Sequence, residues 1–254
     1  MSINKIEMQD DKGNTYYPHT DASIVKYGDS DVATELSESV KKTTTDVTYY
    51  VNSTSGNDLN NGLTNGTAFK TITKAISMIP QVVNHIVNIN ISAGAYNELA
   101  WVTGFAGNGR ININGGTDLT TAINYITNAI YITKCTCTVA LTGFASSATS
   151  GVNSGFYVGS STTAILNYCV DTVTSLSKIG ILADYSFATV SNCQVSNKNV
   201  AIVARNNSKI YSDTNSGNGS NAGLQAVANG TIGKNSTQPS GTTLEIASQG
   251  GVIR

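Results

Sequence analysis

The residues that could carry out catalysis in this chain are few and widely spaced. From residue 99 onward the acidic residues are Asp118, Asp171, Asp184, Asp213 and Glu245. Polysaccharide cleavage needs two carboxylates a few ångströms apart, or an acidic calcium cluster with a basic residue beside it. No repeat unit of the sequence holds two acids that would stack on each other. We therefore interpret each acid as a corner residue that hydrogen-bonds backbone, and we assign no catalytic residue.

Metal and cofactor sites are not expected either. Asp58, in "NDLNNG", resembles a fragment of a calcium loop, but the distal bidentate Glu is missing, so a turn carboxylate that caps backbone amides is the better interpretation. His19 and His85 are distant in sequence from the C-x-C pair, which lacks the ligands to complete a zinc site. We expect the cysteines to be buried, reduced thiols. The four cysteines are Cys135, Cys137, Cys169 and Cys193.

Two aromatic residues are candidates for contact with a sugar ring. Tyr96 and Trp101, the only tryptophan, could stack on a glycan, although packing in the core or at its rim is the alternative for both. The uncharged polar side chains of the sequence are mainly Asn, Ser, Thr and Tyr. These residue types favour hydrogen bonding to a neutral glycan over recognition of a charged partner.

The overall charge excludes several classes of partner. Charged residues make up 12% of the chain and the net charge is −1, where about 25% charged residues is ordinary. Such a chain has no electrostatic footprint for nucleic acid or an anionic membrane. No apolar run is long enough for a signal peptide or a membrane span, so we expect a soluble protein made in a cytoplasm.

The charge distribution predicts two parts. Residues 1–46 hold nine of the sixteen acids and five of the fifteen Lys and Arg residues, so the first part is acidic and residues 47–254 are weakly basic. Within the first part, a hairpin is predicted with its turn at 11–14. Val32, Leu36 and Val40 then form an apolar stripe on a helix too short to be stable alone. We expect this stripe to associate with copies of itself, as a homotrimer.

A long turn and a helix open the second part. The turn-forming run "TSGNDLNNGLTNGTA" follows the apolar strand "TYYVNS", and a helix is predicted over 68–79, ended by Pro80. Such a helix is suited to cap the open end of a stack of strands. Its apolar face consists of Phe69, Ile72, Ala75, Ile76 and Ile79.

An internal repeat in the second half predicts the architecture. Ile202 matches Leu224 and Ile210 matches Ile232 without a gap, and the two preceding units match with small gaps. The alignment places Ile181 with Ile202, Val190 with Ile210 and Val158 with Leu182.

A unit of about 22 residues accommodates three short strands and three corners but no βα unit, given about 3.3 Å per residue. The repeat therefore predicts an all-β fold, a parallel β-helix in which Cys169 lies over Cys193.

The sequence resembles bacteriophage and prophage appendage proteins of the right-handed parallel β-helix, pectate-lyase-like superfamily. The resemblance rests on "YYVNSTSGNDLNNGLTNGTAFKTITKAI", "GILADYSFATVSNCQVSNKN" and "IGKNSTQPSGTTLEIASQGGVIR". The segment "DDKGNTYYPHTDASIVKYGDSDVATELSE" is similar to the openings of phage tail-fibre proteins, where it attaches the fibre to the virion. The resemblance implies a right-handed β-helix in a virion, but not an activity, because the same fold carries lyases, hydrolases and structural shafts.

The functional expectation is a structural virion appendage, a tail fibre or spike, that contacts host-surface polysaccharide. Its partners would be two further copies of itself and other virion proteins bound through residues 1–46. Two alternatives stay open: a polysaccharide depolymerase with carboxylates contributed by two subunits, and a head fibre or capsid decoration protein.

Overall fold

The computed structural model describes residues 41–148, 153–161 and 163–254, together with short pieces of the first 40 residues. The chain divides into two compact units, Met1–Lys41 and Lys42–Arg254. Among the described residues, no helix is both long enough and apolar enough to cross a membrane. The described pieces of the first 40 residues are 8–9, 11–13, 15–16, 26–27, 30–31 and 34.

The first unit contains two short antiparallel strand pairs. β1 (Met8–Gln9) pairs with β2 (Thr15–Tyr16), which confirms the predicted hairpin, and β3 (Lys26–Tyr27) pairs with β4 (Ser30–Asp31). The trimerisation stripe predicted at Val32, Leu36 and Val40 lies outside the described residues.

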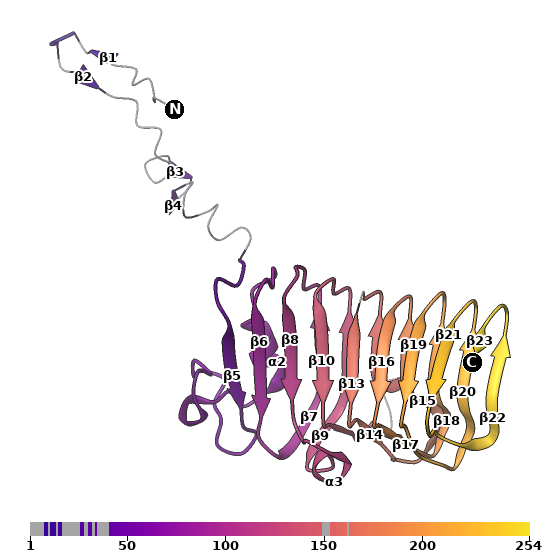
Figure 1. The fold of residues 1–254 in the computed structure, drawn as a ribbon. Helices are drawn as coiled ribbons and strands as arrows, with labels where there is room; N and C mark the ends of the chain where they lie inside the picture. The colour runs from indigo at the N-terminus through magenta and orange to yellow at the C-terminus, as the bar shows by residue number, and fades with distance from the viewer. Residues whose placement is uncertain are drawn as a thin grey trace. The chain divides into compact units, whose positions relative to one another are not determined.

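The second unit is an all-β parallel solenoid of about seven turns (Figure 1). One side, which we call face A, is a nine-stranded parallel sheet that runs from β5 to β23. Its strands are β5 (Val47–Val51), β6 (Ile86–Ile91), β8 (Arg110–Asn114), β10 (Thr138–Thr142), β13 (Ala164–Asn167), β16 (Phe187–Ser191), β19 (Lys209–Asp213), β21 (Thr231–Asn235) and β23 (Val252–Ile253).

The other two sides share a ten-stranded parallel sheet, because long strands extend around the corner between them. Face B contains β11 (Ala145–Ser146), β14 (Val170–Asp171) and β17 (Gln194–Val195). Face C contains β12 (Ser154–Gly159), β15 (Ser175–Asp184), β18 (Lys198–Arg205), β20 (Ser220–Val227) and β22 (Gly241–Ser248). β7 (Gly94–Thr103) and β9 (Tyr125–Thr133) contribute to both faces.

Stacking of apolar residues turn upon turn builds the core. On face A, Val87, Ile111 and Val139 pair in register, and all three are fully buried. On face C, Ile181, Ile202 and Leu224 form an equivalent buried column. Alternate residues of each strand point outward, as the period of two requires.

The corners need left-handed backbone at equivalent places. Between faces C and A, φ is 55° at Lys134, 50° at Ser160, 50° at Tyr185 and 53° at Asn206. Asn adopts this region more readily than other non-glycine residues because its short side chain bonds locally. The many Asn residues of the sequence are therefore suited to such corners, whereas a bulky tyrosine at positive φ is unusual.

The helix of the second unit is shorter than predicted. α2 spans Ile72–Ser77, where Thr71 accepts a bond from the amide of Lys74 and acts as the N-cap, while Phe69 forms an isolated bridge with Val51. The predicted apolar face is buried, and α2 packs against β5, β6 and β7. The other helical segments are η1 (Asn65–Thr67) and α3 (Leu119–Ala122).

The cysteine predictions are confirmed. All four cysteines are reduced and buried, and the amide of Cys169 donates to Sγ of Cys193 at 3.4 Å across adjacent turns. In the next turn of the solenoid the residue beside Cys193 is Asn215, whose Oδ1 accepts a hydrogen bond from the Cys193 amide at 2.8 Å. Burial raises the pKa of Cys137 to about 11, which keeps this thiol protonated.

Candidate functional site

The outer surface of face C carries a column of aromatic side chains. Trp101 of β7 pairs in register with Tyr131 of β9, and Tyr131 pairs with Tyr157 of β12. The ring centroids lie 4.9 Å and 5.1 Å apart, with interplanar angles of 73° and 62°. These edge-to-face contacts are the favoured geometry for aromatic pairs. We call Trp101, Tyr131 and Tyr157 the aromatic column.

Exposure differs along the aromatic column. Trp101 is 46% exposed, whereas Tyr131 is only 9% exposed because its neighbours cover its ring. Beyond Tyr157 the same register continues with Leu182 and Val203. Trp101 thus presents a ring to solvent on a support of two packed tyrosines.

The residues two positions after the aromatic column, at the C-terminal ends of its strands, form a second row that includes polar side chains. The hydroxyl of Thr133 donates to Thr103 Oγ1 at 2.9 Å. In the next turn the equivalent residue is Gly159, and a Cβ at that position would lie 2.5 Å from the Tyr157 hydroxyl. The absence of a side chain at Gly159 therefore makes room for the tyrosine to extend along its own strand.

A charged pair follows Gly159 in the same register. Nε and Nη2 of Arg205 donate to Asp184 Oδ2 at 3.0 Å and 2.8 Å, and Nδ2 of Asn206 donates to Asp184 Oδ1 at 2.8 Å. Burial, together with the negative charge of Asp184, raises the pKa of Tyr157. The Tyr157 hydroxyl thus remains a neutral donor and acceptor beside a fixed ion pair.

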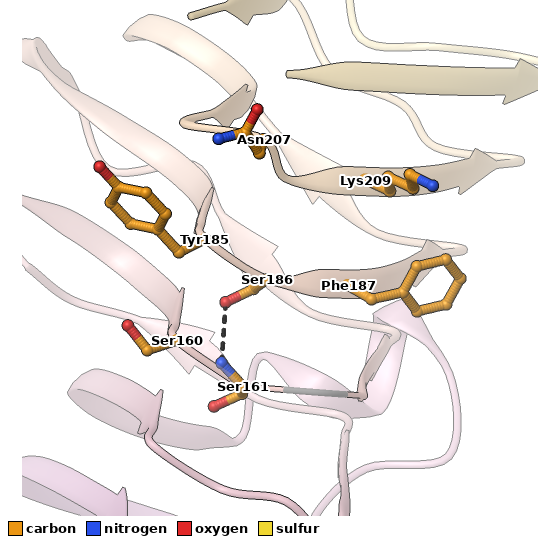
Figure 2. Close-up of a pocket in the computed structure, with 7 residues that line it drawn as sticks. All are labelled: Ser160, Ser161, Tyr185, Ser186, Phe187, Asn207 and Lys209. Atoms are coloured by element: carbon orange, nitrogen blue, oxygen red, sulfur yellow. Dashed lines mark hydrogen bonds between the residues drawn. The ribbon is translucent and has the colours of Figure 1, made fainter. Parts of the chain in front are cut away.

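A cavity of about 580 Å³ lies at the corner that leads from face C to face A (Figure 2). Tyr185 and Phe187 are its most exposed aromatic residues, at 61% and 42%. Figure 2 shows Ser186 between them, where its hydroxyl oxygen accepts a bond from the Ser161 amide at 3.1 Å. The lining residues are Ser160, Ser161, Tyr185, Ser186, Phe187, Asn207 and Lys209.

The composition of this corner cavity suits binding better than catalysis. Buried serine hydroxyls accept hydrogen bonds from backbone amides of the preceding turn. The Ser161 amide donates to Ser186 Oγ, and the Ser186 amide donates to Ser208 Oγ, each at 3.1 Å. Asn207 and Lys209 add an amide and an ammonium group, and the lining contains no carboxylate. Aromatic rings beside hydroxyl, amide and ammonium groups can stack on a sugar and hydrogen-bond its hydroxyls.

The carboxylates of residues 42–254 all have structural partners. Asp58 accepts bonds from the amides of Lys70 and Thr71 at 2.8 Å and 3.0 Å, which confirms its interpretation as a cap. Asp171, Asp184 and Glu245 differ from the interpretation as corner residues bonding backbone, because each is paired with a cationic side chain. Asp213 differs as well, because it accepts its hydrogen bonds from the side chains of Thr214 and Asn235. The other partnered carboxylates are Asp46, Glu98 and Asp118.

The two predicted glycan-contact residues lie in different environments. Tyr96 is 3% exposed; its hydroxyl donates to the carbonyl of Ser92 at 2.7 Å and accepts from the amide of Ser53 at 3.2 Å. A buried ring cannot stack on a ligand from solution, so the glycan hypothesis rests on Trp101. In the described part of the chain, no group of three or more His, Cys, Asp and Glu residues is placed to hold a metal ion.

Sequence reasoning missed Tyr131 and Tyr157, although a signal was present. The segments "WVT", "YIT" and "YVG" each place an aromatic residue two positions before a small or Thr residue at the end of a strand. Spacings of 30 and 26 residues between these segments hid the pattern, because the regular repeat is 22 residues.

Comparison of the chain with protein-family models, with curated proteins and with solved structures found no match. The function must therefore be argued from the residues of this surface.

Proposed function

We propose that the chain is a structural part of a bacteriophage virion appendage, a tail fibre or spike, whose solenoid binds a glycan on the host surface. The resemblance of its opening and closing segments to phage appendage proteins supports the virion origin. A parallel solenoid supports a structural role, since stacked turns give an elongated scaffold with a repeating outer surface. The low content of charged residues, 12%, favours a ligand recognised by hydrogen bonds and ring stacking.

The observation that carries the binding proposal is the aromatic column. A tryptophan ring 46% exposed to solvent and packed edge-on against Tyr131 is held in place before any ligand arrives. Pre-organisation of this kind lowers the entropic cost of binding. Beside it, the Tyr157 hydroxyl and the Asp184–Arg205 pair offer fixed polar groups.

The assembly is part of the same proposal. In it the solenoid is right-handed, α2 caps the first turn, and residues 1–46 attach the protein to the virion. Three copies associate through Val32, Leu36 and Val40. Support for the cap comes from α2 itself, whose buried face packs against β5, β6 and β7. Mass measurement in solution tests the trimer: a monomer at micromolar concentration would contradict it, and Leu36→Asp should weaken a trimer held by the stripe.

Binding is tested with purified bacterial capsular and cell-wall polysaccharides immobilised as a panel. Trp101→Ala should weaken binding about two- to tenfold, the loss expected for one aromatic stacking contact. Tyr211→Ala is the matched control, because Tyr211 is similarly exposed, at 44%, but lies on face A. Equal losses in both variants, or none in Trp101→Ala, would contradict binding at the aromatic column.

The same polysaccharides separate a binder from an enzyme. New reducing or unsaturated ends after incubation would identify a depolymerase with a site between subunits and would replace the binding proposal. Imaging of virions with the labelled protein places it on the tail, as proposed, or on the head, which would instead indicate a head fibre or capsid decoration protein.

A further inference from the structure

A carboxylate lies inside the solenoid, where the neighbouring turns place small or apolar residues. Asp171 of β14 is 1% exposed and pairs in register with Val195, which is fully buried in the core. Its Oδ2 is packed against the backbone of Gly155, where a Cβ would lie only 2.3 Å from that oxygen. The side chain therefore occupies a tight, water-excluded place.

A lysine from the following turn reaches this carboxylate. Lys198, the first residue of β18, is also 1% exposed, and its Nζ lies 2.6 Å from Oδ1 of Asp171. The same Nζ donates to the carbonyl of Val173. The amine is thus held by the backbone against one side of the carboxyl group.

As an ion pair this arrangement is poor. A buried pair offsets its desolvation cost only when hydrogen bonds satisfy the remaining lone pairs and protons. Here Oδ1 of Asp171 accepts no hydrogen bond of ordinary geometry despite the close approach of Nζ, and the buried Nζ of Lys178 and Oγ of Ser154 have no hydrogen-bond partner. Two ammonium groups face one carboxylate, so a positive charge remains without a counterion.

Burial disfavours the charged forms of Asp171 and Lys178. Burial raises the pKa of Asp171 to about 7, although Lys198 and Lys178 both act to lower it. Burial, together with the charge of Lys198, lowers the pKa of Lys178, the other titratable group at this place. A proton that moves from an ammonium to the carboxylate leaves an amine in contact with a carboxylic acid.

We propose that Lys198 and Asp171 are joined by an intramolecular amide bond formed after the chain folds. A bond forms between Nζ of Lys198 and Cγ of Asp171, and one Cγ–O bond breaks. The leaving oxygen takes two protons of the ammonium group and departs as water, so the amide nitrogen keeps one proton. Charge and atoms balance without an oxidant, a reductant or a co-reactant.

Holding the two groups in contact accelerates this step. Amide formation from a free amine and acid is slow, but groups held in contact in a folded protein gain effective molarities of about 10⁵–10⁸ M. The product also replaces two buried charges by a neutral amide. The charge of Lys178 acts on Asp171, and the charge of Lys198 acts on Lys178. The bond would link two successive turns of the solenoid.

The chain contains a matched pair that should not react. Lys234 and Glu245 also form an ion pair, but their side chains are 38% and 35% exposed. Solvent reaches both side chains there, so they lack the confinement of the buried pair. The Asp184–Arg205 pair is excluded by chemistry, because a guanidinium remains protonated and is not a nucleophile.

The intact mass of the folded and then denatured full-length chain tests the proposal without any mutation. We expect a mass lower than that of the sequence by one water molecule. Tryptic digestion should give a branched peptide in which cleavage after Lys198 is blocked, while the peptides that contain Lys234 and Glu245 remain linear. Lys198→Arg should restore the full mass. An unmodified wild-type mass, or a water loss that persists in Lys198→Arg, would overturn the proposal.

Discussion

The outer and inner sides of the ten-stranded sheet hold their side chains in opposite ways over neighbouring turns. Outside, Trp101, Tyr131 and Tyr157 stack in register and leave one ring half exposed. Inside, Asp171 of face B and Lys198 of face C are both 1% exposed. The outer aromatic side chains pack without burying a charge, and one ring is accessible to a ligand. The inner carboxylate and ammonium groups carry a desolvation penalty, and each can contact only its buried neighbours. Burial therefore separates the proposed binding surface from the proposed cross-linking site, both of which lie on the ten-stranded sheet.

The largest expected effect comes from breaking the inner pair. Lys198→Met removes the proposed link and leaves the buried Asp171 with only the charge of Lys178 acting on it. It should lower the free energy of unfolding by about 3–5 kcal/mol, the range for other broken buried pairs. Denaturant unfolding followed by circular dichroism measures this. The double variant Lys198→Met/Asp171→Val is the control. It places the residue found at Val195 into the preceding turn and should recover most of the stability. A single variant as stable as the wild type would contradict the burial of Asp171.

The pH dependence of the same variant sharpens the comparison. A carboxyl whose pKa is raised above its unfolded value of 3.8 binds a proton more tightly in the folded state. Its contribution to stability is present below that value and is lost as pH rises toward the folded pKa. Lys198 acts to lower this pKa, so its removal should raise the pKa further. Lys198→Met should therefore lose stability as pH rises from about 4 to beyond 7, and this loss should exceed that of the double variant, which lacks the carboxyl. The amide-linked wild type, in which Asp171 no longer titrates, should not show this additional loss.

Two glycines of β12 allow a matched test of inside against outside. A Cβ at Gly155 would collide with Asp171 Oδ2 at 2.3 Å in the interior. Gly155→Ala should cost about 1–3 kcal/mol, the usual penalty for overpacking a filled core. Thermal and denaturant unfolding measure the loss, and a neutral result would show that the interior at this place has spare room.

Gly159→Ala, unlike Gly155→Ala, should weaken binding more than it lowers stability. Its Cβ would meet the hydroxyl end of Tyr157 at 2.5 Å, and this flexible side chain can swing away into solvent. Displacement of Tyr157 removes one support of the aromatic column. We expect polysaccharide binding to weaken about two- to fivefold, a fraction of the effect of one aromatic contact, with stability nearly unchanged. Full binding in this variant would show that Tyr157 does not support the site.

The repeat predicted much of the register, and its errors have a physical cause. Ile181 pairs with Ile202, and Ile202 pairs with Leu224, as predicted. Val190 was aligned with Ile210, but Ile210 pairs with Ala188. The corner after Arg205 is one residue longer than the corner after Asp184, because Asn206 and Asn207 both adopt positive φ where Tyr185 does so alone. The alignment placed one residue fewer in this unit where the structure has one more, so it missed the register by two residues. A sequence match cannot tell at which corner an extra residue is accommodated.

A second register error has the same form. Val158 was aligned with Leu182, but Leu182 pairs with Tyr157 and Val158 pairs with Ala183. This error hid the tyrosine that extends the aromatic column. Likewise, no pattern in the sequence brings Lys198 to Asp171, because the lysine side chain reaches back to the preceding turn. Contacts made by long side chains between turns depend on the corners, and the corners were the least predictable part.

The only tryptophan of the chain offers the most direct test of the central claim, that the outer side of face C binds a glycan. Trp101 is 46% exposed at the end of the aromatic column, so its fluorescence reports on this surface without any mutation. Titration with a polysaccharide that the protein retains on the immobilised panel should shift the emission to shorter wavelength and reduce quenching by iodide. Retention of that polysaccharide with unchanged emission and unchanged quenching would place binding elsewhere and contradict the account.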